Sequence, residues 1–305
     1  MRAWRRRDFL IGAAAAAAAA AVPAPLFAQK SDLIRKPIPS SGETLPVVGL
    51  GSARRYEDAQ AADLPALRQT LQRFQELGGM VVDTAPVYGS AEPTIGTLLD
   101  EIKGRNSLFL ATKVSTRGRE AGVKQIEQSF RNLKTSKIDL IAVHNLRDTE
   151  VHLQTLRALK QSGRIRYIGL TTSFDAQYAD FESVMKRETL DFIQVDYALD
   201  NRNAGERILP LARDRGMAVM INLPFGRGRL FNATKNQALP GWAQEIDCNS
   251  WAQFFLKYIV SHEAVTCAIP GMARPEYVVD NLGAARGRLP DAAMRRRMES
   301  FIDGL

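Results

Sequence analysis

The sequence has little cysteine and little histidine, with two and three residues respectively among 305. Two cysteines cannot build a disulfide scaffold, and no cluster of cysteine and histidine has the spacing of a zinc site, so we expect no metal. Cys248 and Cys267 could form one disulfide in an oxidising compartment, and the sequence leaves that pairing open. Cys267 lies in a β-rich segment, which predicts a small buried side chain.

Extremes of composition are also missing. Hydrophobic residues make up 45% of the chain and charged residues 24%, which excludes an intrinsically disordered, collagen-like or coiled-coil protein. The length allows one large domain or two smaller ones, but no linker-like stretch divides the chain. We therefore expect a single globular domain after the N-terminal segment.

The N-terminal hydrophobic run, residues 9–22, is shorter than the ~20 residues that a membrane-spanning helix requires. It is rich in alanine, follows a basic start and leads to small residues, as a secretory signal does. Arg6 and Arg7, followed by Asp-Phe-Leu, resemble the twin-arginine (Tat) export motif. We expect a Tat-type signal peptide over residues 1–28, cleaved after Ala28. An uncleaved anchor and a start codon assigned too early are the alternatives.

Export predicts the compartment and one partner of the protein. The Tat translocase would bind the chain during export, and residues 29–305 would work in the periplasm without a stable membrane span after cleavage.

A strong excess of one charge is absent from this mature chain. The full sequence has a formal charge of +8, and residues 1–28 contribute four arginines and one aspartate, which leaves +5. The cluster Arg295-Arg296-Arg297 lies in an amphipathic segment and is interpreted as a solvated helix face. No basic stripe alternates with aromatic residues, so no nucleic-acid partner is expected.

Eight short β-rich segments recur along the chain. Their apolar residues run continuously instead of alternating with polar ones, which favours strands buried on both faces of a parallel sheet. The segments are residues 47–50, 80–83, 108–112, 140–143, 167–170, 192–195, 218–221 and 266–269.

Amphipathic segments separate these predicted strands. Glycines 78, 163 and 216 each stand just before a strand, where a left-handed helix C-cap belongs. Repeated strand–helix units predict the α/β class and a single-domain (β/α)8 TIM barrel over residues 29–305. A doubly wound open sheet is the alternative, but the turn at Gly49-Leu50-Gly51 lacks the third glycine of its fingerprint. Residues 225–240 are expected to form an irregular functional loop.

Titratable side chains end successive predicted strands. Asp83 ends the second strand, Lys113 the third and His144 the fourth, and Tyr88 follows Asp83 in a short turn. Because the carboxyl ends of barrel strands line the active site, these four side chains should converge. Two later strands end in the polar residues Gln194 and Asn222.

The segment Gly79-Met-Val-Val-Asp83-Thr-Ala-Pro-Val-Tyr88-Gly89 closely resembles the signature of the aldo-keto reductases. More segments similar to that family follow in the same order, and their order along nearly the whole mature chain makes the resemblance specific. They are residues 138–144, 163–169, 194–197, 224–228, 269–271 and 280–282.

The resemblance implies an NAD(P)H-dependent reduction of an aldehyde or ketone to an alcohol, catalysed by Asp83, Tyr88, Lys113 and His144. Tyr88 would be the general acid. Because a tyrosine pKa of ~10 makes a weak acid near neutrality, the ammonium of Lys113, held by Asp83, should lower that pKa. His144 would donate a hydrogen bond that orients the substrate carbonyl. A nicotinamide must supply the hydride, since no side chain can.

The resemblance also implies NADP(H) as the cofactor, with NAD(H) as the alternative. Thr171, Thr172 and Gln194 would hold the carboxamide, although two threonines replace the family's usual Ser-Asn pair. Asn222 stands where many members have a stacking aromatic. The other expected cofactor contacts are Gly226, Arg227, Gly228, Gly271, Arg274 and Asn281, of which Arg274 would supply a charge for the adenosine phosphate.

Two other functions stay open at this level. The departures at Asn222, Thr172 and Gly271 are compatible with a regulatory barrel that binds a nicotinamide without turnover. Lys113 could instead form a Schiff base, as in aldolases. The sequence identifies neither the substrate, beyond a small carbonyl compound, nor the oligomeric state.

Overall fold

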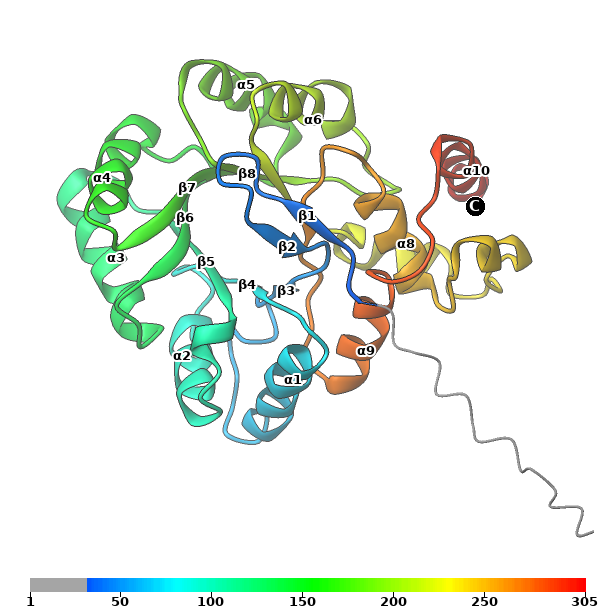
Figure 1. Ribbon diagram of the computed structural model, residues 1–305, viewed down its shortest axis with the longest axis horizontal. Coiled ribbons are helices and arrows are strands. Elements are labelled where there is room, and N and C mark those ends of the chain that lie inside the picture. The colour runs from blue at the N-terminus through cyan, green and yellow to red at the C-terminus, as the bar shows by residue number, and fades with distance from the viewer. Residues whose placement is uncertain (1–31) are drawn as a thin grey trace, which may run out of the picture. The chain divides into compact units, whose positions relative to one another are not determined.

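The computed structural model describes residues 32–305, so the predicted signal peptide lies outside the described residues. In this part of the chain, eight parallel strands form one sheet in the order β10-β9-β8-β7-β6-β5-β4-β3. The two edges meet, because the Gly49 amide donates to the Ala268 carbonyl at 2.8 Å and the Gly51 amide donates to the Pro270 carbonyl at 2.9 Å. The predicted (β/α)8 barrel is therefore confirmed, and the open sheet is wrong (Figure 1).

All eight predicted strands occur close to their expected positions. They are β3 (Leu50–Gly51), β4 (Val81–Asp83), β5 (Phe109–Val114), β6 (Ile138–His144), β7 (Ile165–Thr171), β8 (Phe192–Asp196), β9 (Ala218–Asn222) and β10 (Cys267–Ala268).

Helices follow the strands and surround the barrel, as Figure 1 shows. The predicted caps at Gly78, Gly163 and Gly216 have φ values of 89°, 75° and 66°, which a side chain would strain. The helices are α1 (Leu64–Glu76), α2 (Ala91–Glu101), α3 (Arg119–Asn132), α4 (Thr149–Gln161), α5 (Tyr178–Arg187), α6 (Ala204–Asp214), α7 (Arg229–Ala233), α8 (Trp251–Val260), α9 (Pro275–Gly283) and α10 (Ala292–Asp303).

The segment expected to be irregular after β9 contains short helices. A 3₁₀ turn at Gly226–Gly228 leads into α7, and a second 3₁₀ segment follows at Gly241–Ile246. The ring centroids of Phe225 and Phe231 lie 4.8 Å apart, and they pack against Phe255 of α8 at 6.3 and 5.4 Å respectively. This aromatic packing orders the segment locally, although its glycines had favoured an irregular loop.

A hairpin covers the amino end of the barrel. Its strands β1 (Arg35–Pro37) and β2 (Thr44–Pro46) pair antiparallel and cross the centre of the barrel in Figure 1. Ile38 and Leu45 of this hairpin are buried in the same apolar cluster as Phe109, Tyr167 and Phe192, which line the barrel interior. The hairpin therefore plugs one end of the barrel and leaves the carboxyl ends of the strands for a site.

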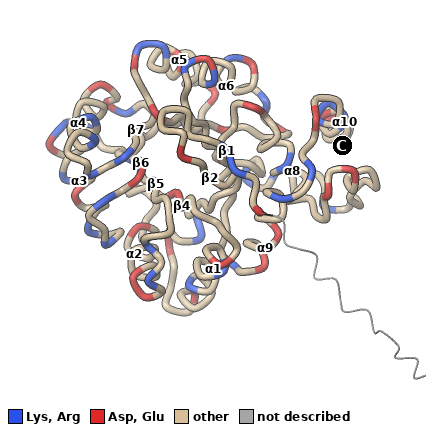
Figure 2. The backbone as a smooth tube through the Cα atoms, viewed as in Figure 1, with Lys and Arg blue, Asp and Glu red and all other residues tan. Residues whose placement is uncertain are grey.

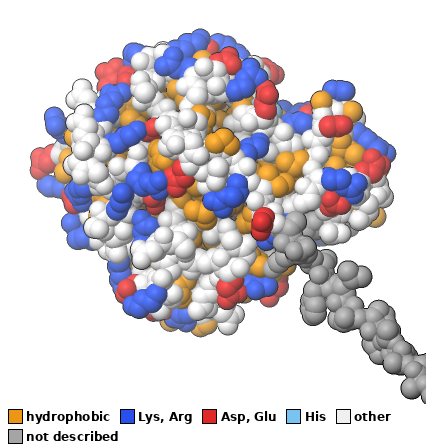
Figure 3. Space-filling view, in the orientation of Figure 1, with side chains coloured by type: hydrophobic (Ala, Val, Ile, Leu, Met, Phe, Trp, Pro, Cys, Tyr) orange, Lys and Arg blue, Asp and Glu red, His pale blue; other side chains and the backbone are white. Residues whose placement is uncertain are grey.

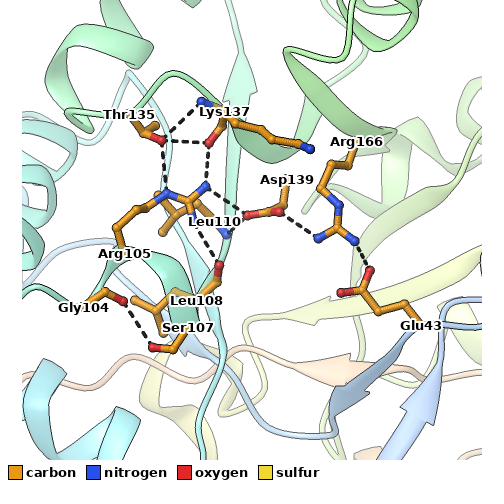
Figure 4. Close-up of polar contacts among 10 residues, drawn as sticks. All are labelled: Glu43, Gly104, Arg105, Ser107, Leu108, Leu110, Thr135, Lys137, Asp139 and Arg166. Carbon is orange, nitrogen blue, oxygen red and sulfur yellow. Dashed lines mark hydrogen bonds and ion pairs between the residues drawn. The ribbon is translucent and has the colours of Figure 1, made fainter.

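An ionic network surrounds Asp139 at this amino end, shown in Figure 4. The Asp139 carboxylate accepts hydrogen bonds from Arg105 at 3.3 Å, from Arg166 at 2.9 Å and from the Leu110 amide at 2.8 Å. Arg166 also pairs with Glu43 of the hairpin. Asp139, Arg105, Arg166 and Glu43 each have at least one partner, so the network ties the plug to the barrel.

Charges of both signs are interspersed over the outer helices and over the face drawn in Figures 2 and 3. The interpretation of the C-terminal arginines as a solvated face is wrong for Arg295, which is half-buried and donates to the Ser261 hydroxyl at 2.7 Å and to the Tyr197 hydroxyl at 2.8 Å. Within residues 32–305 no helix is long and apolar enough to cross a membrane. Cys248 and Cys267 are both buried and unpaired with each other.

Candidate active site

Inward-facing side chains change from apolar to polar along several strands. Val81 begins β4 in the apolar core, and Asp83 ends the same strand in the site. In β8 the change runs from Phe192 to Gln194. The site therefore lies at the carboxyl end of the barrel, opposite the hairpin plug, as the fold rule for these barrels predicts.

Lys113 and Asp83 form a buried ion pair across neighbouring strands. The Lys113 Nζ donates to the two Asp83 carboxylate oxygens at 2.9 and 2.8 Å and to the Thr84 carbonyl at 2.7 Å. Burial alone lowers the pKa of Lys113, but the Asp83 carboxylate and the Tyr88 hydroxyl outweigh it and raise the pKa above its ordinary value. The raised pKa favours the charged ammonium, and its three hydrogen bonds hold it in one position.

Tyr88 lies over this ammonium, with 5.2 Å between the Lys113 Nζ and the ring centroid. Burial raises the pKa of the Tyr88 hydroxyl above its ordinary value, and the Lys113 charge opposes that rise. The expectation that Lys113 lowers this pKa is correct for its own contribution and wrong for the net direction. The physical reason is that the loss of water around the hydroxyl costs the tyrosinate more than one nearby ammonium returns.

His144 ends β6 and lies beside Tyr88. Their rings meet edge to face with centroids 6.1 Å apart. Burial, assisted by the charges of Lys113 and Arg147, lowers the pKa of His144 to about 3. The imidazole is therefore neutral near pH 7 and keeps one N–H, which suits a hydrogen-bond donor to a carbonyl oxygen.

Gln194 belongs to the same network as the ion pair. Its amide Nε2 donates to the Asp83 carboxylate at 2.9 Å, and its Oε1 accepts from the Thr171 hydroxyl at 3.0 Å. A chain of contacts thus joins Thr171, Gln194, Asp83, Lys113 and Tyr88. Sequence reasoning predicted Gln194 only as a cofactor contact and did not connect it to Asp83.

These groups open into a cleft of about 700 Å³. Most of the predicted site residues line it, and they come from six strands and the loops that follow them. The predicted residues in the cleft wall are Asp83, Tyr88, His144, Thr171, Gln194, Asn222, Arg227, Gly228 and Gly271.

The remaining predicted residues lie outside the wall. Lys113 is behind Asp83, and Thr172 is fully buried with its hydroxyl bonded to Gln177 at 2.6 Å. Gly226 packs on Asp200 so closely that a Cβ would come within 2.1 Å of its carboxylate. Arg274 is exposed at the N-cap of α9, and Asn281 is buried in that helix.

Several cleft residues were missed by sequence reasoning. Arg54, Arg55 and Glu57 come from the loop between β3 and α1, and Phe225 and Phe231 from the segment after β9. The position of Arg54 and Arg55 directly after the first strand was a usable signal, because every loop at this end of a barrel faces the site. Residues 32–305 contain no cluster of His, Cys, Asp and Glu that could hold a metal ion.

Comparison with known proteins agrees with this geometry. The sequence model of the Aldo/keto reductase family matches residues 47–301. Methylglyoxal reductase YeaE of Escherichia coli is 30% identical over 273 residues, covering 85% of this chain and 93% of the relative. The chain therefore belongs to the aldo/keto reductase family, and it is an oxidoreductase that acts on carbonyl compounds with a nicotinamide cofactor.

Solved structures share the fold. An aldo-keto reductase from Klebsiella pneumoniae in complex with NADPH superposes with a TM-score of 0.74 at 23% identity, covering 89% of this chain and 95% of that one. The holo form of AKR11C1 from Bacillus halodurans gives 0.70 at 23% identity, covering 88% and 96%.

The cleft fits a dinucleotide. The Asn222 Oδ1 is buried and has no hydrogen-bond partner among the described residues, so it can accept from an amide group. Gly228 and Gly271 expose backbone to the cleft, and a Cβ built on either would meet no atom closer than 4.0 Å. Unpartnered polar groups and accessible backbone along one cleft are what a carboxamide and a pyrophosphate require.

Proposed function

We propose that this protein reduces an aldehyde or ketone to an alcohol with NADP(H), with Tyr88 as the general acid. The observation that carries the proposal is the Lys113 ammonium, which donates three hydrogen bonds and lies over the Tyr88 ring, while neutral His144 meets the same ring edge to face. A proton donor, a fixed cation and a neutral hydrogen-bond donor converge where a carbonyl oxygen would develop negative charge.

The residues have separate tasks in this reaction. Tyr88 gives its hydroxyl proton to the carbonyl oxygen, and Lys113 stabilises the tyrosinate left behind. Asp83 and the Thr84 carbonyl hold Lys113, and Gln194 holds Asp83 in turn. His144 orients the carbonyl through its N–H. When bound, the reduced nicotinamide supplies the hydride that the carbonyl carbon receives, and it is oxidised in the process. Thr171, Asn222, Arg227, Gly228 and Gly271 would hold the cofactor.

NADP(H) is proposed ahead of NAD(H). Arg274 is exposed at the start of α9 and makes no ion pair within residues 32–305, so it is available to a phosphate on the adenosine. Asn281 lies near the other end of the same helix, α9. Fluorescence titration of the purified protein with NADPH and NADH tests this preference, and equal affinity for the two would contradict it.

The two other functions receive less support. A Schiff base requires a neutral amine, but the Lys113 Nζ has three acceptors, is 1% exposed and has a raised pKa. The non-catalytic barrel was motivated by Asn222, Thr172 and Gly271, none of which belongs to the proton-donating group. NADPH consumption with a panel of aldehydes that includes methylglyoxal tests turnover. A rate that Tyr88→Phe leaves unchanged would exclude the proposed mechanism.

We further propose that the protein is exported by the Tat pathway and works in the periplasm. Support comes from the arginine pair and the alanine-rich run, and from a family match that begins only at residue 47. Because Tat substrates cross the membrane folded, the cofactor would be acquired before export.

Cell fractionation tests the export proposal. Replacing Arg6 and Arg7 with lysine should retain the protein in the cytoplasm, and the N-terminus of the exported protein should be Gln29. Protein purified from the periplasm should release a nicotinamide nucleotide on denaturation. Neither bound nucleotide nor specific binding in the exported protein would contradict the idea that it carries its cofactor.

A further inference from the structure

The cleft that contains Tyr88 and His144 carries positive charge that the proposed proton transfer does not use. Arg54 and Arg55 line the cleft, and neither side chain makes an ion pair or hydrogen bond with any residue of the described chain. Most arginines elsewhere in residues 32–305 do have such a partner, for example Arg68 with Glu101 and Arg166 with Asp139. Two adjacent guanidinium groups without a counter-charge in a cleft are an unusual feature that points to an anionic ligand.

The loop that carries these arginines is anchored on the catalytic groups. At its start, the Ser52 amide donates to the Asp83 carbonyl at 3.0 Å. At its end, the Glu57 carbonyl accepts from the amide of Ser90 at 2.7 Å and from its hydroxyl at 2.8 Å. Ser90 follows Tyr88 in the same turn, so the arginines lie between two attachments that bracket Asp83 and Tyr88.

The interior of the loop is fixed as well. Tyr56, next to Arg55, is completely buried, and its amide donates to the Ser52 carbonyl at 3.2 Å. The Glu57 carboxylate is near enough to contribute, after burial and Asp83, to the raised pKa of Tyr88. The arginines therefore stand in a loop that is held at both ends, and they line the same cleft as Tyr88 and His144.

The charges in the cleft wall do not cancel. Its cations are Arg54, Arg55 and Arg227, and its anions are Glu57 and Asp83. Asp83 is already neutralised by Lys113. In the proposed function, Arg227 and the glycines around it serve the cofactor, which leaves Arg54 and Arg55 for the substrate.

We propose that Arg54 and Arg55 form an anion-binding subsite beside Tyr88 and His144, so that the preferred substrates are aldehydes or ketones that carry a carboxylate or a phosphate. A planar guanidinium binds either group through two parallel hydrogen bonds. This inference rests on the proposed carbonyl reduction. The subsite adds a substrate class to the proposed reduction. The carbonyl oxygen of the substrate would lie at Tyr88, and Arg54 and Arg55 would hold its anionic end.

Matched substrates test the subsite on the whole enzyme with saturating NADPH. The first pair is 4-formylbenzoate and its methyl ester, which differ in charge with the same aromatic aldehyde. The second pair is glyceraldehyde 3-phosphate and glyceraldehyde, which separates phosphate from carboxylate recognition. For the preferred anion, kcat/KM should exceed that of the neutral partner by about tenfold or more, and added salt should reduce the difference.

The variant is Arg54→Gln combined with Arg55→Gln. It should lower kcat/KM for the anionic substrate about 10- to 100-fold, mainly through KM, and change the neutral substrate by less than about twofold. The matched control is Arg119→Gln combined with Arg296→Gln, which removes the same charge from two exposed arginines outside the cleft. This control should leave both substrates unchanged.

Three results separate the possibilities. Equal kcat/KM for charged and neutral partners in the wild type overturns the subsite. A double variant that loses both substrates equally and binds NADPH more weakly also overturns it, because the arginines would then serve the cofactor. Failure of the proposed function itself looks different, since no aldehyde of either kind would then give a rate that depends on Tyr88.

Discussion

The two ends of this barrel hold buried charges in opposite ways. At the amino end, Asp139 lies between Arg105 and Arg166, and Arg166 reaches Glu43 of the hairpin. At the carboxyl end, Lys113 is held by Asp83, but His144 Nδ1 and Asn222 Oδ1 are buried and lack hydrogen-bond partners among residues 32–305. The amino end is satisfied internally, whereas the carboxyl end keeps polar groups available for a cofactor and substrate.

The pKa values differ between the ends for the same reason. The carboxyl end contains a histidine whose pKa falls to about 3 and an aspartate, Asp196, whose pKa rises to about 6, both mainly through burial. Groups perturbed by burial without a full set of partners are common at functional sites. The difference teaches that polar groups at the amino end serve stability alone, whereas polar groups at the carboxyl end are also available for chemistry. It can be tested by substitutions at each end.

The largest effect is expected from Lys113→Met. Removal of the ammonium leaves the Asp83 carboxylate buried with Gln194 as its remaining side-chain partner, which should cost about 3–5 kcal/mol of unfolding free energy. Turnover should fall about 10²–10⁴-fold, because the tyrosinate at Tyr88 loses its cation. Urea unfolding and steady-state kinetics measure the two effects. A variant with full activity would remove Lys113 from the mechanism.

At the amino end, Asp139→Asn should affect stability alone. The neutral amide weakens the charge-assisted hydrogen bonds from Arg105 and Arg166, and we expect a loss of about 2–4 kcal/mol. Turnover at a temperature where the variant stays folded should remain within about twofold of wild type. The control is Glu101→Gln, which breaks an exposed pair with Arg68 and should cost less than about 1 kcal/mol. A large loss of kcat in folded Asp139→Asn would contradict the separation of the two ends.

Asp196 gives the carboxyl end a pH-dependent stability. Because burial raises its pKa from 3.8 to about 6, the folded state binds more protons than the unfolded state between these values. Stability should therefore fall as the pH rises from about 4 to 6, by about 1–3 kcal/mol from this residue. Asp196→Asn should remove that part of the dependence. Unfolding free energies of both proteins at pH 4 and pH 7 measure it, and a constant difference between them would contradict the assignment.

The smallest effect concerns the pH dependence of turnover. With its pKa lowered to about 3, His144 stays neutral at pH 5 and above, so it should add no limb to the kcat profile between pH 5 and 8. The test is to measure kcat for the wild type and for the His144→Gln variant across this pH range. A limb near pH 6.5 that disappears in the variant would show a histidine that titrates normally.

Much of the fold and the core of the site could be predicted from the sequence. Continuous apolar runs identified the strands, and Gly78, Gly163 and Gly216 identified helix ends, since both depend on local chemistry. Asp83, Lys113 and His144 could be placed together because the carboxyl ends of parallel strands share one rim. Tyr88 was found by its position in the turn after Asp83.

The rest depends on contacts between distant segments. The net pKa of Tyr88 follows from burial by several loops, and the bond from Gln194 to Asp83 crosses the barrel between β8 and β4. Thr172 faces Gln177 instead of the cleft, which the adjacent Thr171 does not reveal. The ion pairs of Asp139 join a hairpin, a helix end and two strands, a set that no local pattern brings together.

One pair of substitutions tests most directly whether the chemistry is confined to the carboxyl end. Tyr88→Phe and Tyr167→Phe make the same chemical change at opposite ends, since the Tyr167 hydroxyl bonds Ser41 and Glu43 of the plug, each at 2.8 Å. Both variants are compared for kcat with NADPH and an aldehyde and for unfolding free energy.

Tyr88→Phe should lose about 10²–10⁴-fold in kcat with little change in stability, and Tyr167→Phe should lose about 1–2 kcal/mol with turnover intact. Turnover that survives Tyr88→Phe, or that collapses in folded Tyr167→Phe, would contradict the account.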